Sequence, residues 1–440
     1  MNASMTGRNP DAARLVLFVG GFDPRGARHY HRLMREESQK QAAVQGERRY
    51  VIGPREPWNT AGSEKSPHSM WRVQQQGLKA GTDVNVAASV DASVEERADQ
   101  CADTEFVFFD WHDQVRANWP ESRARVFSDA LPTYAEVWRS RQWLAPIHRQ
   151  ARFTLWALAY PIVYAVLVCA LGLLLGGLLG AALAGFSSAA AAVAACVAWA
   201  LVCWGGFVLD GHIHVSWLLR ILNFARSSSE QGLPVLDARM EAMAAEVAQG
   251  MRQGRWREVV VLGFSVGSVQ AVKLVVALRQ QLAADQSAAP DAVLASAPAV
   301  GLVTLGNCIP LFGLFPGARS LRGALQALAL DPLVYWADIS SPSDSVCFGM
   351  CDVVGLSLRE DAQKSAKPSG TQWGLNPQAM CSPRFHKLFH PAGYRWLRRN
   401  KMRMHFQYLM AGEIAGSYDY FELLSSPGLV RDYIRKKLVR

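Results

Sequence analysis

A serine between two glycines stands where a strand-like segment changes into a helix-like one. Residues 259–274 read VVVLGFSVGSVQAVKL, in which Gly263, Ser265 and Gly267 form the pattern G-x-S-x-G. A serine hydroxyl is a weak nucleophile until a neighbouring base takes its proton, and a sharp strand-to-helix turn exposes the hydroxyl to such a base. The pattern therefore predicts a covalent nucleophile at Ser265.

The glycines and the helix that follows them have a physical role in this prediction. A side chain at Gly263 or Gly267 would collide with the neighbouring strand or helix in so tight a turn. In the first turn of the helix the backbone N–H of Val266 is free to bind an oxyanion. The pattern also occurs by chance, and the alternative is a glycine-bracketed turn whose serine takes no part in chemistry.

The segments around this serine read as alternating strands and helices. Besides the strand that ends before Ser265, apolar runs predict strands at residues 14–21, 105–113, 300–306 and 333–340. Helices are predicted at residues 27–44, 234–254, 266–284 and 320–330, and the second of them places on one face Met240, Met243, Val247 and Met251. This alternation predicts an α/β fold with a mostly parallel central sheet flanked by helices.

A long uncharged segment interrupts this pattern. Residues 153–209 contain no Asp, Glu, Lys or Arg, and the only break is GFSS at residues 185–188. Each side of the break exceeds the roughly twenty residues that cross a bilayer. We therefore predict a transmembrane helical hairpin at residues 151–210, while the alternative is a helical hairpin buried inside a large soluble domain.

Arginines flank both ends of the uncharged segment. Arg149 and Arg152 precede it, and Arg220 and Arg226 follow it. Because basic residues favour the cytoplasmic side, both ends are expected there, at the inner membrane. Residues 1–150 and 211–440 then share one compartment and form one domain. Within it, parts of residues 53–103 are rich in Gly, Pro, Ser and Asn, and are expected to be loop or weakly ordered.

Charge and composition narrow the class of partner. The net charge of +9 suits either an anionic lipid surface or a nucleic acid. The basic residues are not interleaved with a recognisable nucleic-acid module, so no nucleic-acid partner is expected. The chain has no phosphate-binding Walker pattern and no CxxC pair, and we expect neither a cofactor nor a metal. The uncharged spans hold no charge of the kind that marks an ion path, which disfavours a transporter.

A strand, the G-x-S-x-G turn and a helix in this order resemble the α/β-hydrolase superfamily, especially its serine esterases and lipases. The resemblance covers residues 14–21 and residues 258–409, with the apolar hairpin as an insertion. It implies the chain order serine, acid, histidine, with the acid on a loop after a later strand. Asp344, in the segment WADISSPSDSVCF, fits this place best, and Asp338 and Asp352 are the alternatives.

The resemblance also implies a histidine near the end of the domain. His405 is followed three residues later by an aromatic residue, Tyr408, as in many hydrolase domains, and we favour it as the base. His390 is the main alternative, and it lies with His386 in a basic loop flanked by prolines.

In many relatives a His-Gly pair after the first strand positions a second oxyanion donor. This chain has FVGGFDPRG there, so Gly20 replaces the histidine and Gly21 matches the glycine. By this match the N–H of Phe22 is the second donor beside that of Val266. The alternative is that the two glycines only form a turn.

Together these features predict a membrane-anchored serine hydrolase that cleaves an acyl ester, with a lipid as the leading substrate. Ser265 would attack the carbonyl carbon, His405 would take the proton, and Asp344 would orient the imidazole. The alternative is a protein that keeps the fold without catalysis and serves as a membrane-bound binding or scaffolding module.

Overall fold

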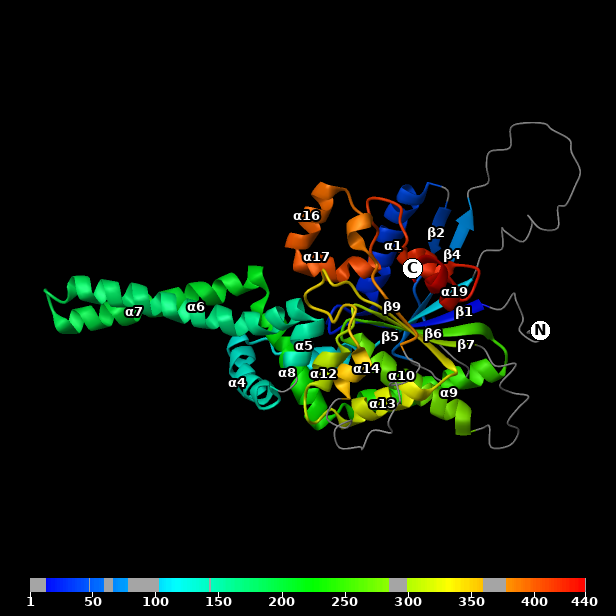
Figure 1. The fold of residues 1–440 in the computed structure, drawn as a ribbon, viewed down its shortest axis with the longest axis horizontal. Helices are drawn as coiled ribbons and strands as arrows, with labels where there is room; N and C mark the ends of the chain where they lie inside the picture. The colour runs from blue at the N-terminus through cyan, green and yellow to red at the C-terminus, as the bar shows by residue number, and fades with distance from the viewer. Residues whose placement is uncertain are drawn as a thin grey trace, which may run out of the picture.

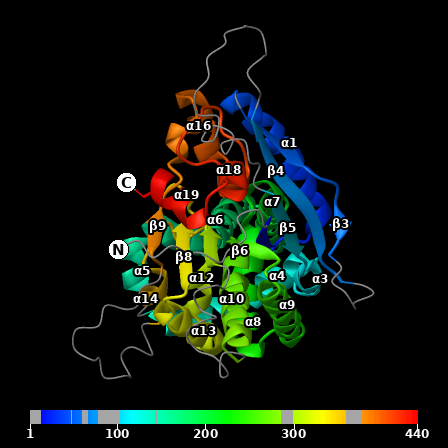
Figure 2. The same cartoon turned by 90° about the vertical axis from the view of Figure 1, so that its right-hand side faces the viewer.

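The structure is a computed structural model that describes residues 13–46, 48–58, 66–77, 103–141, 144–284, 299–358 and 377–439. This part of the chain forms a nine-stranded sheet that lies between two layers of helices. A pair of long helices projects from this body (Figure 1), and in the view of Figure 2 it lies behind the body. The α/β class predicted from the sequence is confirmed.

The centre of the sheet is parallel. Its strands pair in the order β5-β1-β6-β7-β8-β9, every neighbouring pair being parallel. Their bounds are β1 (Ala13–Val19), β5 (Thr104–Phe109), β6 (Trp256–Phe264), β7 (Ala299–Leu305), β8 (Val334–Ile339) and β9 (Ala379–Cys381). Most residues of these strands are buried, as expected when helices cover both faces.

One edge of the sheet makes it mixed rather than parallel throughout. There β4 (Ser69–Gly77) pairs antiparallel with β5, and both β2 (Arg48–Ile52) and β3 (Glu56–Pro57) pair antiparallel with β4. In β4 the side chains of Trp71 and Val73 are fully buried and Arg72 between them is exposed. The structure thus forms strands within residues 53–103, where we expected loop in part, while residues 59–65 and 78–102 lie outside the described residues.

Each face of the sheet packs against its own hydrophobic core. In β1, Leu15 and Leu17 point into one core while Val16 and Phe18 point into the other, following the two-residue repeat of a strand. The first core holds residues of α3 (His112–Ala117), α5 (Leu144–Gln150), α8 (Val215–Gln231), α9 (Pro234–Arg252), α10 (Gly267–Ala284), α12 (Ile309–Gly313), α13 (Arg319–Leu330) and α14 (Val353–Ser357). The second holds residues of α1 (Gly26–Gln45), α16 (Pro391–Arg399), α17 (Lys401–Phe406), α18 (Tyr420–Ser425) and α19 (Val430–Lys437).

The helices predicted from the sequence at α1, α9, α10 and α13 are confirmed. In α9 the side chains of Met240, Met243, Val247 and Met251 are all buried in the first core, so the methionine stripe is core packing. A smaller cluster joins α4 (Arg123–Arg139) to α8 through Val126 and Leu219. It lies beside the base of the projecting helices (Figure 1).

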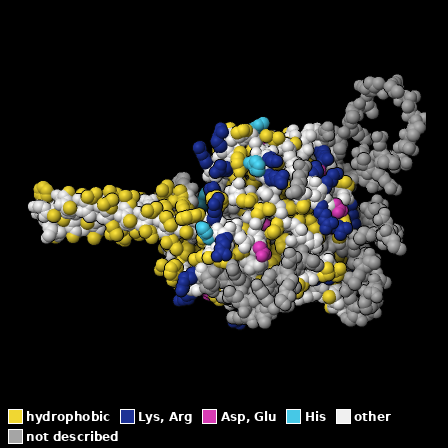
Figure 3. All heavy atoms as spheres, in the orientation of Figure 1, with side chains coloured by type: hydrophobic (Ala, Val, Ile, Leu, Met, Phe, Trp, Pro, Cys, Tyr) yellow, Lys and Arg dark blue, Asp and Glu magenta, His cyan; other side chains and the backbone are white. Residues whose placement is uncertain are grey.

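The projecting pair consists of α6 (Arg152–Leu183) and α7 (Ser188–Ile213), with the turn where the sequence predicted a break. A side chain at Gly176 would come within 2.6 Å of the Ala195 carbonyl oxygen, so the small residues of α6 allow α7 to pack closely. Both helices are long and apolar enough to cross a membrane, and the most apolar windows are 11% and 0% buried. This exposure excludes a hairpin buried inside a soluble domain (Figure 3).

Candidate active site

Ser265 occupies a strained turn between β6 and α10. Its backbone φ is +57°, a left-handed conformation that non-glycine residues adopt mostly under structural constraint. A side chain at Gly263 would lie 2.6 Å from the Ser268 Cα, and one at Gly267 would overlap the carbonyl oxygens of Val19 and Gly20. The steric need for both glycines, predicted from the sequence, is therefore confirmed by backbone contacts.

The structure brings Ser265, His405 and Asp344 together. The His405 Nε2 lies 2.8 Å from the Ser265 Oγ, and its Nδ1 lies 2.7 Å from the Asp344 Oδ2. The three residues come from the turn after β6, from α17 and from the loop after β8. All three are buried, with 5% of Ser265 exposed, 1% of His405 and 2% of Asp344.

The two distances fit one tautomer of a neutral imidazole. In it the His405 Nδ1–H donates to the Asp344 carboxylate, which only accepts hydrogen bonds, and Nε2 accepts the Ser265 hydroxyl. The other carboxylate oxygen of Asp344 accepts the Val346 N–H at 3.1 Å, which holds the carboxylate in place. Chemically, such an arrangement can serve as a nucleophile, a general base and a group that orients the base.

Tyr408, three residues after His405, links the segment of this histidine to the loop that carries Asp344. Tyr408 is fully buried, and its hydroxyl oxygen accepts the Ser341 N–H at 2.8 Å. The Cys347 Sγ lies 3.4 Å from the same hydroxyl. Tyr408 thereby ties the segment after His405 to the loop that carries Asp344, which gives a structural reason for an aromatic residue at this spacing.

Asp338, the alternative acid within the strand, does not reach the histidine. Its Oδ1 accepts hydrogen bonds from Thr304 at 2.6 Å, Asn307 at 2.9 Å and Ser340 at 3.1 Å. Burial raises the pKa of Asp338 to about 7, against the effect of these donors. The carboxyl group therefore links the ends of β7 and β8 and does not contact His405.

The remaining alternatives have other structural roles. Asp352 is exposed and caps the N-terminus of α14, where its Oδ1 accepts the Gly355 N–H at 2.8 Å. His390 is exposed at the N-cap of α16, and His386 is exposed with its ring edge against Tyr394. In the described part of the chain none of the three contacts Ser265, so the structure favours Asp344 and His405.

The proposed oxyanion donors flank the serine. Within the described residues, the backbone N–H groups of Phe22 and Val266 have no hydrogen-bond partner. A side chain on Gly21 would lie 3.1 Å from the Ser265 Cβ, so the loop after β1 approaches the nucleophile closely. The Phe22 ring stacks on Phe224 with the ring centroids 4.3 Å apart, which fixes this loop.

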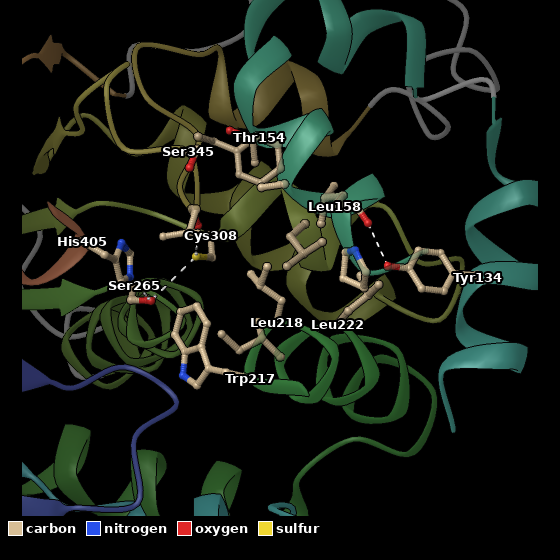
Figure 4. A pocket seen from close by; sticks show the side chains of 16 residues that line it. Tyr134, Thr154, Leu158, Trp217, Leu218, Leu222, Ser265, Cys308, Ser345 and His405 are labelled. Carbon is tan, nitrogen blue, oxygen red and sulfur yellow. Dashed lines mark hydrogen bonds between the residues drawn. The ribbon is translucent and has the colours of Figure 1, made fainter. Parts of the chain in front are cut away.

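Two cavities meet at Ser265 and His405. The wider one measures about 300 Å³ and is bounded by Phe22, Asp23 and Arg25. The second is a narrow apolar channel that leads from Ser265 toward α6 and α8 (Figure 4). Trp217 of α8 borders both cavities, a position that no sequence pattern had indicated because it depends on how α8 packs.

Cys308 is a further neighbour of Ser265, one that no sequence pattern indicated. Its Sγ lies 3.8 Å from the Ser265 Oγ. Burial raises the pKa of the Cys308 thiol to about 12, so the thiol is neutral and does not compete with the serine as an anion. A lone cysteine more than forty residues from the serine gave no signal in the sequence.

The described residues contain no group of three or more His, Cys, Asp or Glu side chains that would hold a metal ion. Comparison with models of known protein families, with curated proteins and with solved structures found no match.

Proposed function

We propose that this protein is a membrane-anchored serine hydrolase of the α/β-hydrolase kind, which cleaves an acyl ester through an acyl-enzyme. The observation that carries the proposal is the pair of hydrogen bonds, 2.8 Å and 2.7 Å long, that join Ser265 to His405 and His405 to Asp344. Three residues so distant in sequence form this arrangement at a turn with a left-handed serine, a combination that a purely structural loop does not need.

The proposed reaction has two halves. The Ser265 Oγ attacks the ester carbonyl carbon while the His405 Nε2 takes the hydroxyl proton, and the resulting oxyanion accepts hydrogen bonds from the Phe22 and Val266 N–H groups. The C–O bond to the alcohol then breaks, and the alcohol leaves with the proton held by His405. Water repeats the sequence on the acyl-enzyme, giving a carboxylic acid and free Ser265.

Asp344 contributes by holding the imidazole and by stabilising its charge. The His405 ring becomes positive in each half-reaction, and the buried carboxylate 2.7 Å from Nδ1 offsets that charge. In addition, the hydrogen bond fixes the tautomer in which Nε2 faces the serine. The carboxylate does not need to take up a proton for this purpose.

The projecting hairpin supports the membrane location. Large apolar side chains along it are exposed, with 66% of Leu173 and 60% of Leu201 exposed, and such surface is stable only in an apolar surrounding. Both ends of the hairpin join the same body, and arginines flank them, which favours a body on the cytoplasmic side of the inner membrane. No nucleic-acid partner is proposed.

A fluorophosphonate probe tests the nucleophile directly in the purified full-length protein. We expect the wild type to be labelled, Ser265→Ala to remain unlabelled, and His405→Gln to react at least about a hundredfold more slowly because the base is lost. His390→Gln is the matched control, since this histidine is exposed and does not contact the serine.

The competing proposal is a hydrolase fold that serves as a membrane-bound scaffold. An unlabelled wild type with a cooperative thermal transition would favour this scaffold and would contradict the hydrolase. Equal labelling rates for the His405→Gln and His390→Gln variants would also contradict the mechanism, because the base would then have no role.

A further inference from the structure

The narrow channel beside Ser265 is built partly from the hairpin itself. Figure 4 shows Ser265 and His405 at one end, with Leu158 and Tyr134 at the other. One wall consists of residues in the first three turns of α6, and the other consists of residues of α8. The side chains that define these walls are Ala157, Leu158 and Pro161, and Trp217, Leu218 and Leu222.

Two hydroxyl groups along the channel, those of Thr154 and Tyr134, are already paired. The Thr154 hydroxyl donates to the Cys347 carbonyl oxygen at 2.5 Å, and the Tyr134 hydroxyl donates to the Leu158 carbonyl oxygen at 2.8 Å. A polar ligand would lose its hydrogen bonds to water there and would find few partners among the mostly apolar lining side chains, whereas an alkyl chain loses none. The lining therefore fits a hydrocarbon.

The channel runs toward the side of the body from which the hairpin leaves. The helix that forms its wall begins at Arg152 and continues without interruption to Leu183. Pro161 lines the channel, and from Ile162 onward the exposed side chains of α6 are apolar, so the channel adjoins the surface proposed to contact lipid. A hydrocarbon chain that enters there does not have to cross water.

The size of the channel limits the shape of the hydrocarbon chain that can enter it. Its free volume is about 30 Å³, far less than that of the cavity on the other side of Ser265. An acyl chain that enters must therefore displace half-buried side chains such as Leu158 and Leu218. This displacement is feasible because side chains that are partly exposed change rotamer rapidly. A straight chain needs the least displacement, and a branched or aromatic acyl group needs the most.

We propose that the acyl part of the substrate occupies this channel and that the substrate is an ester of a straight alkyl acid drawn from the bilayer. The first turns of α6 then determine specificity in addition to anchoring the protein. The wider cavity, bounded by Asp23 and Arg25, receives the alcohol part of the ester. This inference rests on the proposed hydrolase function, because it places the acyl part of the substrate on one side of Ser265 and the alcohol part on the other.

The test uses full-length protein in phosphatidylcholine nanodiscs and 4-methylumbelliferyl esters of acetate, butyrate, octanoate and dodecanoate. Each buried methylene contributes roughly fourfold to kcat/KM until the channel is full. We expect Ala157→Phe, which adds a ring at the channel wall, to lower kcat/KM for dodecanoate about tenfold or more while acetate changes less than about twofold. Ala159→Phe is the matched control on the same helix, because Ala159 does not line the channel.

Several outcomes would overturn the inference. One is an equal loss of acetate and dodecanoate turnover in Ala157→Phe, and another is no loss of either. If Ala157→Phe fails to fold, Leu158→Ala serves instead, and it should raise dodecanoate turnover relative to acetate. Turnover of dodecanoate from the bilayer should also exceed that from a cyclodextrin carrier with detergent-solubilised protein, and equal or slower turnover would overturn entry from the bilayer.

The proposed function and this inference fail in different ways. If no ester is hydrolysed and the fluorophosphonate probe does not label Ser265, the hydrolase proposal itself is wrong. If the probe labels Ser265 and acetate is hydrolysed without any dependence on chain length, the hydrolase stands and the acyl channel is wrong.

Discussion

Asp338 offers a test of the structure near the site, because it is a buried carboxyl group that the proposed mechanism does not use. Its second oxygen, Oδ2, has no hydrogen-bond partner in the described part of the chain. Burial raises the pKa of Asp338 to about 7 even though Thr304, Asn307 and Ser340 donate to the other oxygen. The change Asp338→Asn keeps the shape and that acceptor oxygen but removes the titration.

The expected effect on stability follows from linkage between protonation and folding. In the unfolded chain the carboxyl ionises near its ordinary pKa of 3.8, while in the folded protein it stays protonated up to about 7. Between these pH values the folded state binds more protons, so its stability falls as the pH rises and the loss is complete above pH 7. A difference of about three units at about 1.4 kcal/mol each gives an upper limit of about 4 kcal/mol. About 3 kcal/mol of this falls between pH 5 and pH 8.

Thermal unfolding of both proteins in the same detergent measures this effect. The melting temperature of Asp338→Asn relative to the wild type should rise between pH 5 and pH 8 by several degrees. The comparison cancels the groups that titrate equally in both proteins. A difference in melting temperature that stays constant over this range would refute the reasoning. The variant should keep fluorophosphonate labelling at Ser265, because Asp338 does not contact His405.

Two further substitutions test the site and the fold. Asp344→Asn should leave the thermal transition in place but lower the labelling rate of Ser265 by about 10²–10⁴-fold, because the imidazole loses its orienting partner; a rate within about threefold of the wild type would instead mean that another group orients His405. Arg14 is fully buried, its Nε lies 2.7 Å from Glu258 and its Nη1 donates to the Leu424 carbonyl oxygen. Arg14→Ala should therefore cost about 3–5 kcal/mol in denaturant unfolding, and a cost below about 1 kcal/mol would show that Glu258 finds other partners.

The strands at the centre of the sheet were predictable because they are buried on both faces. The run VVVLGF, which ends at Phe264, is apolar at every position but the glycine. The strand β4 was missed because it is buried on one face only and ends in three glutamines. The strand β4 pairs with β5, which is distant in the sequence, and a local sequence pattern does not reveal such a pairing.

The sharp turn that holds Ser265 was predictable for a different reason. The need for glycine at position 263 is local, because a side chain there would collide with Ser268 in the same turn, whereas a side chain at Gly267 would collide with Val19 and Gly20 at the end of the adjacent strand β1. The acid was ambiguous, since Asp338, Asp344 and Asp352 lie within fifteen residues of one another. The sequence pattern only favoured Asp344 over the other two. The packing of β8 and of the loop after it shows that Asp344 is the one that contacts His405.

The sequence alone determined where the hydroxyl stands and that a long uncharged segment divides the chain. Both properties are written in consecutive residues, through steric limits on a turn and the cost of burying charge in lipid. Only the tertiary structure decided which histidine and which aspartate meet Ser265, and that α6 borders its apolar channel. Those contacts join residues up to about 140 positions apart, and they exist only once the sheet has set the register of its strands and the helices have packed on its faces.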